Sequence, residues 1–237
     1  MTTRRLSRRA LAAAAASTLL IGLTTGFAAI ASADSDHQPA EHINGPFVQV
    51  YGPVAPVVGV VPATMFPLPT ELSGVSITMN GTRVPVLGVA SVRGQDQINF
   101  QVPLELTGQT QATVVVTVNG RAGTPVDVPL RTAQPEIFAV QQQPLAWTIW
   151  ATGLGSVTNA PGTGQPAPSS PLARLREQDV RVTIGGVDAP VFYAGLSPGF
   201  AGLYQVNVTP PPGVAADAPV VLRVGSAESQ PWQAPVR

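Results

Sequence analysis

The chain has 237 residues, of which 44% are hydrophobic and 11% are charged, with 13 basic and 13 acidic residues, 23 glycines and 25 prolines. The charged share is less than half of the roughly 25% typical of soluble domains, and so much glycine and proline favours a turn-rich β fold that still buries a core. Because cysteine and lysine are both absent, the composition excludes disulfide frameworks, lipid anchoring through cysteine, cysteine nucleophiles and lysine bases.

The first 33 residues have the pattern of a cleaved signal peptide. Four arginines lie in the first nine residues without an acid, an Ala-rich apolar stretch follows, and an Ala-Ser-Ala cleavage pattern ends at Ala33. We therefore expect a mature chain that starts at Asp34, contains no membrane span and is secreted. The pair Arg8-Arg9 fits both twin-arginine and Sec export, so both routes stay open.

The mature chain is mildly acidic. Removal of the signal leaves nine arginines against 13 acids, and these arginines are scattered along the sequence. A surface that follows nucleic-acid phosphates needs clustered basic residues. Nucleic acid is therefore not an expected partner.

Short apolar or alternating runs separated by turn signals follow the signal, as is typical of an all-β sandwich protein. Asn80-Gly81 predicts a type I′ hairpin, because both central residues of that turn need positive φ. One possible turn of helix at 172–176 is the sole helical candidate. The expected strands cover 47–51, 75–79, 84–89, 97–102, 113–118 and 126–130, then 146–151, 180–184, 191–193, 203–208 and 220–224, with a last run near Trp232.

The two halves of the mature chain repeat each other. VSITMNGTRVPVL from Val75 aligns with VRVTIGGVDAPVF from Val180, and QINFQVP at 97–103 aligns with QVNVTPP at 205–211. We infer an internal duplication of a unit of roughly 90 residues, the size of one β-sandwich domain. The expected organisation is a signal peptide (1–33), a flexible segment (34–44), a first unit (45–131), a linker or connecting strand (132–143), and a second unit (144–237) with an irregular loop at 156–179.

Over about residues 45–230, the ordered motifs VYG, PLPTELSGVSITMNG, QINFQVP, PEIF, WATGLGSVT and VTIGGVDAPVFYAGLSPGFAGLYQVNV resemble an uncharacterised family of secreted bacterial proteins, the Solibacter-type C-terminal domain. The resemblance implies two tandem antiparallel immunoglobulin-like β-sandwich units of the IPT/TIG type, usually found at the end of larger extracellular proteins. It brings no catalytic residues to this chain.

Residues suited to catalysis or metal binding are sparse. The only histidines, His37 and His42, follow the signal directly, so a serine nucleophile in the later chain has no histidine base. Glycoside hydrolysis by paired carboxylates stays open as an alternative, but each candidate is more simply a turn or solvated loop residue. The candidates are Asp96, Glu177, Asp179 and Asp188. No metal or cofactor motif is present, and we expect no cofactor.

Aromatic side chains are the candidates for ligand contact. An exposed aromatic platform is one way for a secreted sandwich to hold a sugar or peptide, and Trp147, Trp150 and Tyr204 are the residues proposed for it. Strand alternation places Trp147 and Trp150 on opposite faces. Core packing is the alternative for each of these rings.

A repeated Gln-x-Asn motif marks the same predicted strand in both halves. Alternation directs the apolar residues of QINFQVP to the core, and Gln97 and Asn99, like Gln205 and Asn207, to the opposite face. We interpret these amides as structural groups that bond loop backbone. The uncharged stretch 156–170 predicts either disorder or a loop lying along the surface.

The leading functional hypothesis is a secreted, non-catalytic module for cell-surface or matrix interaction, or a structural spacer. Its partner would be an unknown protein or glycan outside the cell. A carbohydrate-binding module and a small hydrolase with paired carboxylates are the alternatives.

Overall fold

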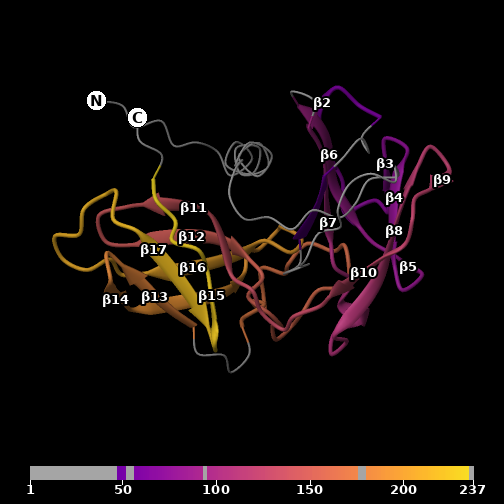
Figure 1. Cartoon of the computed structure of the whole chain (residues 1–237). Coiled ribbons are helices and arrows are strands. Elements are labelled where there is room, and N and C mark those ends of the chain that lie inside the picture. The colour runs from indigo at the N-terminus through magenta and orange to yellow at the C-terminus, as the bar shows by residue number, and fades with distance from the viewer. Residues whose placement is uncertain (1–46, 52–55, 93–94, 176–179, 235–237) are drawn as a thin grey trace.

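The fold is all-β, in agreement with the sequence prediction. The computed structural model describes residues 47–51, 56–92, 95–175 and 180–234. Four antiparallel sheets form two units, the first in indigo to magenta and the second in orange to yellow in Figure 1. The predicted signal peptide, its cleavage junction and the segment 34–44 lie outside the described residues.

The first unit contains two sheets that face each other across a core. One sheet has the strand order β1-β7-β6-β2, formed by Phe47–Tyr51, Gln95–Gln101, Val86–Val92 and Gly59–Pro62. The other has the order β10-β8-β4-β3, formed by Val126–Pro129, Gln111–Val118, Val75–Met79 and Glu71–Leu72, with β5 (Thr82–Arg83) on β4 and β9 (Arg121–Ala122) on β8. A short 3-10 turn, η1 (Leu104–Leu106), follows β7.

The second unit has the same plan. Its first sheet has the order β11-β12-β16-β15, formed by Glu136–Gln142, Trp147–Thr152, Tyr204–Val208 and Val191–Leu196. Its second sheet has the order β14-β13-β17-β18, formed by Val187–Ala189, Val180–Ile184, Val220–Val224 and Ala227–Glu228. Strand β11 lies within the segment predicted to connect the units.

Strand alternation accounts for the two cores. In β4, Val75, Ile77 and Met79 are fully buried while the residues between them are not. The same period buries Trp147, Ile149 and Ala151 of β12 in the second core. Apolar side chains on one face of each sheet are removed from water by the facing sheet, and this burial is the main stabilising term of a sandwich.

Residues aligned between the halves occupy the same positions in the strand pairing. Val75 pairs with Val118 as Val180 pairs with Val224. The register shift in the β6–β7 pair, after Val86, recurs in the β15–β16 pair after its aligned residue, Val191.

The predicted hairpin at Asn80-Gly81 is confirmed by φ angles of 49° and 78°. The helical turn expected at 172–176 is wrong, because Arg174 and Leu175 form β-bridges to Gly195 and Val157. The sequence pattern does not predict the short strands β2, β3, β5, β9, β14 and β18. Runs of two to four residues give little evidence of an alternating period.

Candidate functional site

Two of the three aromatic candidates lie in the second core. Trp147 and Tyr204 are each 5% exposed and pack among its apolar residues. The Tyr204 hydroxyl donates a hydrogen bond to the carbonyl oxygen of Gly155, and burial raises its pKa far above the usual value. Burial therefore removes both rings from ligand contact. Trp150 is half-buried and points away from that core.

In the part of the chain that the structure describes, the repeated amides hydrogen-bond each other. Gln97 Nε2 donates to Asn99 Oδ1 at 2.8 Å, and Gln205 Nε2 donates to Asn207 Oδ1 at 3.0 Å. Residues two apart on a strand share a face, so the motif places each pair within reach. Loop backbone is bonded by the next residue on this face, Gln101, whose Oε1 accepts the Gly164 N–H at 2.8 Å.

The Gly164 contact belongs to a loop that joins the two units. We call residues 156–175 the docking loop; it is folded, with Val157, Ala167 and Ala173 buried in the second core. From the second unit it reaches the first, where Leu68 N–H donates to the carbonyl oxygen of Gly164 at 2.9 Å. Of the two predictions for this stretch, the ordered loop matches the described residues.

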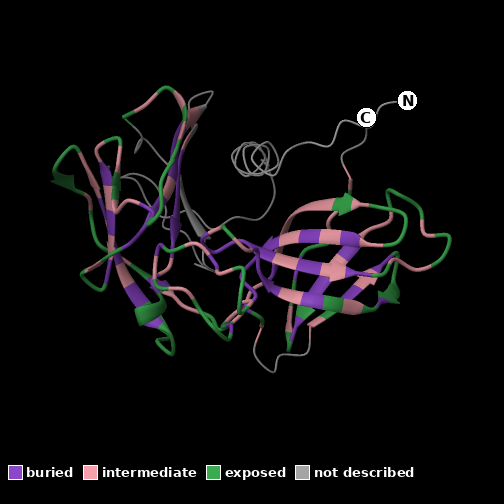
Figure 2. Cartoon of the chain, turned by 180° about the vertical axis from the view of Figure 1, so that it is seen from behind, coloured by how far each residue is buried: buried purple, intermediate pink, exposed green. Residues whose placement is uncertain are grey.

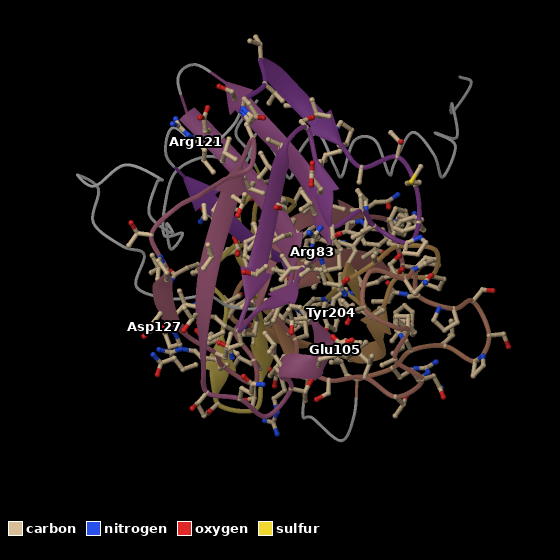
Figure 3. The ribbon with its side chains drawn as sticks, turned by 90° about the vertical axis from the view of Figure 1, so that its right-hand side faces the viewer. Arg83, Glu105, Arg121, Asp127 and Tyr204 are labelled. Carbon is tan, nitrogen blue, oxygen red and sulfur yellow. The ribbon has the colours of Figure 1, made fainter. Side chains whose placement is uncertain are left out.

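A neighbouring residue adds two more hydrogen bonds between the docking loop and the first unit. The Thr163 hydroxyl accepts the Leu104 N–H at 3.0 Å and donates to Glu105 Oε2 at 2.7 Å. Both partners lie on η1, where Figure 3 labels Glu105. The loop therefore bonds the first unit at β7, at η1 and at Leu68.

The sheet β11-β12-β16-β15 presents a polar surface opposite its core side. We call this surface, formed by Gln141, Thr148, Trp150, Gln205 and Asn207, the outer face. Strand pairing sets Trp150 beside Gln205 and Thr148 beside both Asn207 and Gln141. In Figure 2, which views the second unit from this side, no other described segment crosses the four strands. The five side chains of the outer face are half-buried or exposed.

One end of the outer face is covered by the docking loop. The Arg174 guanidinium lies 4.9 Å from the centre of the Tyr193 ring, a cation–π contact. The Tyr193 hydroxyl donates to the carbonyl oxygen of Leu196 at 2.8 Å. Desolvation raises the Tyr193 pKa, and the Arg174 charge offsets part of that rise.

A half-buried carboxyl and a buried hydroxyl lie at the opposite end of the same sheet. Glu136 of β11 pairs directly with Thr152 of β12. Burial raises the pKa of Glu136 from 4.5 to about 7, and Thr152 Oγ1 has no hydrogen-bond partner among the described residues. Sequence reasoning missed Glu136, because nothing in the neighbouring sequence distinguishes a partly buried glutamate on a strand from a solvated glutamate in a linker.

The predicted carboxylates do not form a pair in the part of the chain that the structure describes. Asp96 lies in β7 of the first unit, and Asp188 is exposed on β14 of the second. Glu177 and Asp179 lie outside the described residues. Among the described residues, no group of three or more His, Cys, Asp or Glu side chains could hold a metal ion.

Charged residues of the first unit are dispersed. Arg83, Arg121 and Asp127 lie well apart in Figure 3, and Asp127 Oδ1 accepts a hydrogen bond from the Thr113 hydroxyl. No helix in the described part of the chain is long and apolar enough to cross a membrane.

Comparisons with known proteins add little to these observations. No family model matches the chain, and no curated protein matches it. The Solibacter-type resemblance therefore stays a prediction. Among solved structures, the chain is similar to one described as tandem Ig repeats of Dlar, with 13% identity, 79% of this chain and 95% of that chain covered, and a TM-score of 0.19. The immunoglobulin-like fold class therefore rests on the strand pairing within the two units.

Proposed function

We propose that the protein is a secreted, non-catalytic extracellular module that holds two immunoglobulin-like units at a fixed spacing for interaction at a cell surface or in a matrix. Secretion rests on the arginine-rich, apolar N-terminus and the cleavage pattern that ends at Ala33. The fixed spacing rests on the contacts of the docking loop.

The hydrogen bond from Gly164 to Gln101 carries the proposal. Gln101 is 3% exposed, and a buried amide without a partner would cost about 1–3 kcal/mol. Its Oε1 accepts a backbone N–H that belongs to the other unit. If the units separated, Gln101 Oε1 and the Gly164 N–H would lose this hydrogen bond. The bond therefore favours one fixed arrangement of the units over two units joined by a flexible linker.

The internal duplication and the family resemblance are part of the same proposal. Equal pairing registers in the two units support an origin from one repeated domain. The order of motifs supports membership of the Solibacter-type family of secreted proteins.

The non-catalytic part of the proposal rests on the inventory of reactive groups. No histidine occurs after His42, and cysteine and lysine are absent from the whole chain. Hydrolysis by two carboxylates needs them roughly 5–10 Å apart across a cleft. The described candidates Asp96 and Asp188 belong to different units, which favours a binding or spacing role over the hydrolase alternative.

Export and activity can be measured on the full chain expressed in a bacterial host. We expect the protein outside the cytoplasm with Asp34 as its first residue, identified by N-terminal sequencing. Replacement of Arg8-Arg9 by two lysines separates the routes, because it should abolish twin-arginine export and spare Sec export. The purified protein should turn over neither polysaccharides nor esters, and turnover that disappears in Asp96→Asn would overturn the non-catalytic proposal.

A further inference from the structure

We propose that the outer face binds a neutral polysaccharide strand, with the Trp150 ring as its stacking platform. This inference rests on the proposed extracellular role and gives it a ligand class. It follows from the surroundings of Trp150, from the free hydrogen-bonding capacity of the neighbouring amides, and from the contrast with the first unit.

The ring of Trp150 has a small neighbour on one side. Its pairing partner on β11 is Ala139, at a register shift, while its partner on β16 is Gln205. Alanine has no side-chain atom beyond Cβ, so the residue paired with Trp150 on β11 leaves space beside the ring; the larger neighbour on this strand is Phe138, at the register shift. A half-buried indole beside polar groups is suited to stack against the apolar face of a sugar ring.

Amide and hydroxyl groups surround this ring. The bond from Gln205 to Asn207 uses one donor and one acceptor, and both Asn207 Nδ2 protons remain outside it. Gln205 Oε1 receives the Ser197 hydroxyl at a long 3.4 Å. Thr148 and Gln141 extend the polar row across the sheet.

The chemistry of the outer face selects the class of ligand. Its five residues carry amides, a hydroxyl and an indole; the nearby charged residues are Arg174, which stacks on Tyr193 beside Asn207, and Glu136, which pairs with Thr152. Uncharged donors and acceptors beside an aromatic ring complement a hydroxyl-rich, neutral polymer, whereas an anionic polymer needs arginine or lysine for its charge.

The two copies of the Gln-x-Asn motif differ in burial. Gln97 and Asn99 are 9% and 1% exposed, and the next amide of that row, Gln101, is bonded to the docking loop. Gln205 and Asn207 are only half-buried, and in Figure 2 no other described ribbon crosses their strand. The repeated amides are thus more accessible in the second unit than in the first.

Affinity electrophoresis of the mature protein in gels containing xylan, mannan, hydroxyethylcellulose or a β-1,3-glucan tests this proposal, with alginate as the anionic comparison. At least one neutral polymer should retard the protein, and calorimetry with oligosaccharides of that polymer should give its Kd. Trp150→Ala should weaken binding by about tenfold or more, because it removes the stacking surface. Trp150→Phe should retain part of the affinity.

Phe66→Ala is the matched control, because Phe66 is an exposed aromatic residue of the first unit, 47% exposed. Its affinity should equal that of the unaltered protein. A double variant with Gln205→Ala and Asn207→Ala should also weaken binding and tests the site independently of tryptophan packing. Thermal unfolding of each variant shows that the second unit is folded.

Three results would overturn the polysaccharide site: no neutral polymer binds, only alginate or an extended peptide binds, or folded Trp150→Ala binds as well as the unaltered chain. None of these three results contradicts the proposed extracellular function, provided that the protein is exported and shows no turnover. If the protein instead hydrolysed a bound polysaccharide, the proposed non-catalytic function would be contradicted, but the proposed binding site would not.

Discussion

Glu136 is a half-buried residue whose carboxyl does not titrate at its ordinary pH. Burial disfavours its charged form and raises the pKa of its carboxyl to about 7. In the unfolded chain the same group titrates near its usual 4.5. Between these two values the folded protein holds a proton that the unfolded chain has released, so the free energy of unfolding falls as the pH rises through this window.

We expect the unfolding free energy to fall by on the order of 2–3 kcal/mol between about pH 4.5 and pH 7, and to level off above it, because the ionised carboxyl must then stay buried. Glu136→Gln should abolish most of this slope and be the more stable protein at pH 8. Urea unfolding at several pH values measures both effects. The control is Glu71→Gln, which makes the same replacement at an exposed glutamate on β3. An equal slope in Glu136→Gln would show that other groups cause the pH dependence.

At the scale of single elements, alternation and turn chemistry predict most strands and both cores. These signals are local: a period of two and an Asn-Gly pair are complete within a few residues. Strand β11 shows the limit of such reasoning, because the sequence left a linker and a connecting strand both open for 132–143, whereas in the structure EIFAVQQ pairs with β12 as part of the second unit. The contacts of the docking loop are harder to predict from the sequence, because they use the Thr163 side chain and backbone groups of Gly164. Such contacts produce no periodic pattern of residues.

Gly195 of β15 allows the docking loop to cover the sheet edge. A Cβ at this position would clash with the carbonyl oxygen of Ala173 and lie 3.0 Å from Arg174 Cα, at the backbone segment that accepts the Leu196 N–H. Gly195→Ala should therefore destabilise the protein by about 1–3 kcal/mol, as overpacking does. Denaturant unfolding measures this loss.

Gly88→Ala provides the matched control for Gly195→Ala. Gly88 also lies in a strand, β6, but a Cβ there would meet Val61 O at an ordinary 3.5 Å. Because alanine restricts the unfolded chain more than glycine, this variant should be neutral or slightly more stable. Equal losses in the two variants would show that the close approach of the docking loop is not what requires glycine.

Over the whole molecule, sequence reasoning reached the fold class but only part of the candidate site. Alternation places Trp147 and Trp150 on opposite faces, yet only the packing of the second sheet decides which of them is buried. The Gln-x-Asn motif is visible in the sequence, but the sequence does not show that its amides are buried in the first unit and half-buried in the second. Burial of this kind depends on contacts between segments that are far apart in the sequence.

The docking loop should also control the motion of the two units. Gly164 has a positive φ of 77°, and a Cβ on it would lie 3.2 Å from Pro85 Cγ and 3.5 Å from Leu68 N. Gly164→Ala combines this crowding with a backbone cost of roughly 1–2 kcal/mol, so we expect the loop to leave the first unit. Gly162→Ala, in the same loop with one ordinary contact at 3.6 Å, is the control.

Nuclear magnetic resonance can follow this release directly. In the unaltered protein, the ¹⁵N relaxation rates of the two units should give one common tumbling time, and the Leu68 amide should be protected from exchange because it donates to Gly164. In Gly164→Ala the tumbling times should separate and the Leu68 protection should fall, whereas Gly162→Ala should keep both. Since each core is built within its own unit, both units should stay folded in all three proteins. A common tumbling time that persists in Gly164→Ala would mean that contacts other than the docking loop hold the units together.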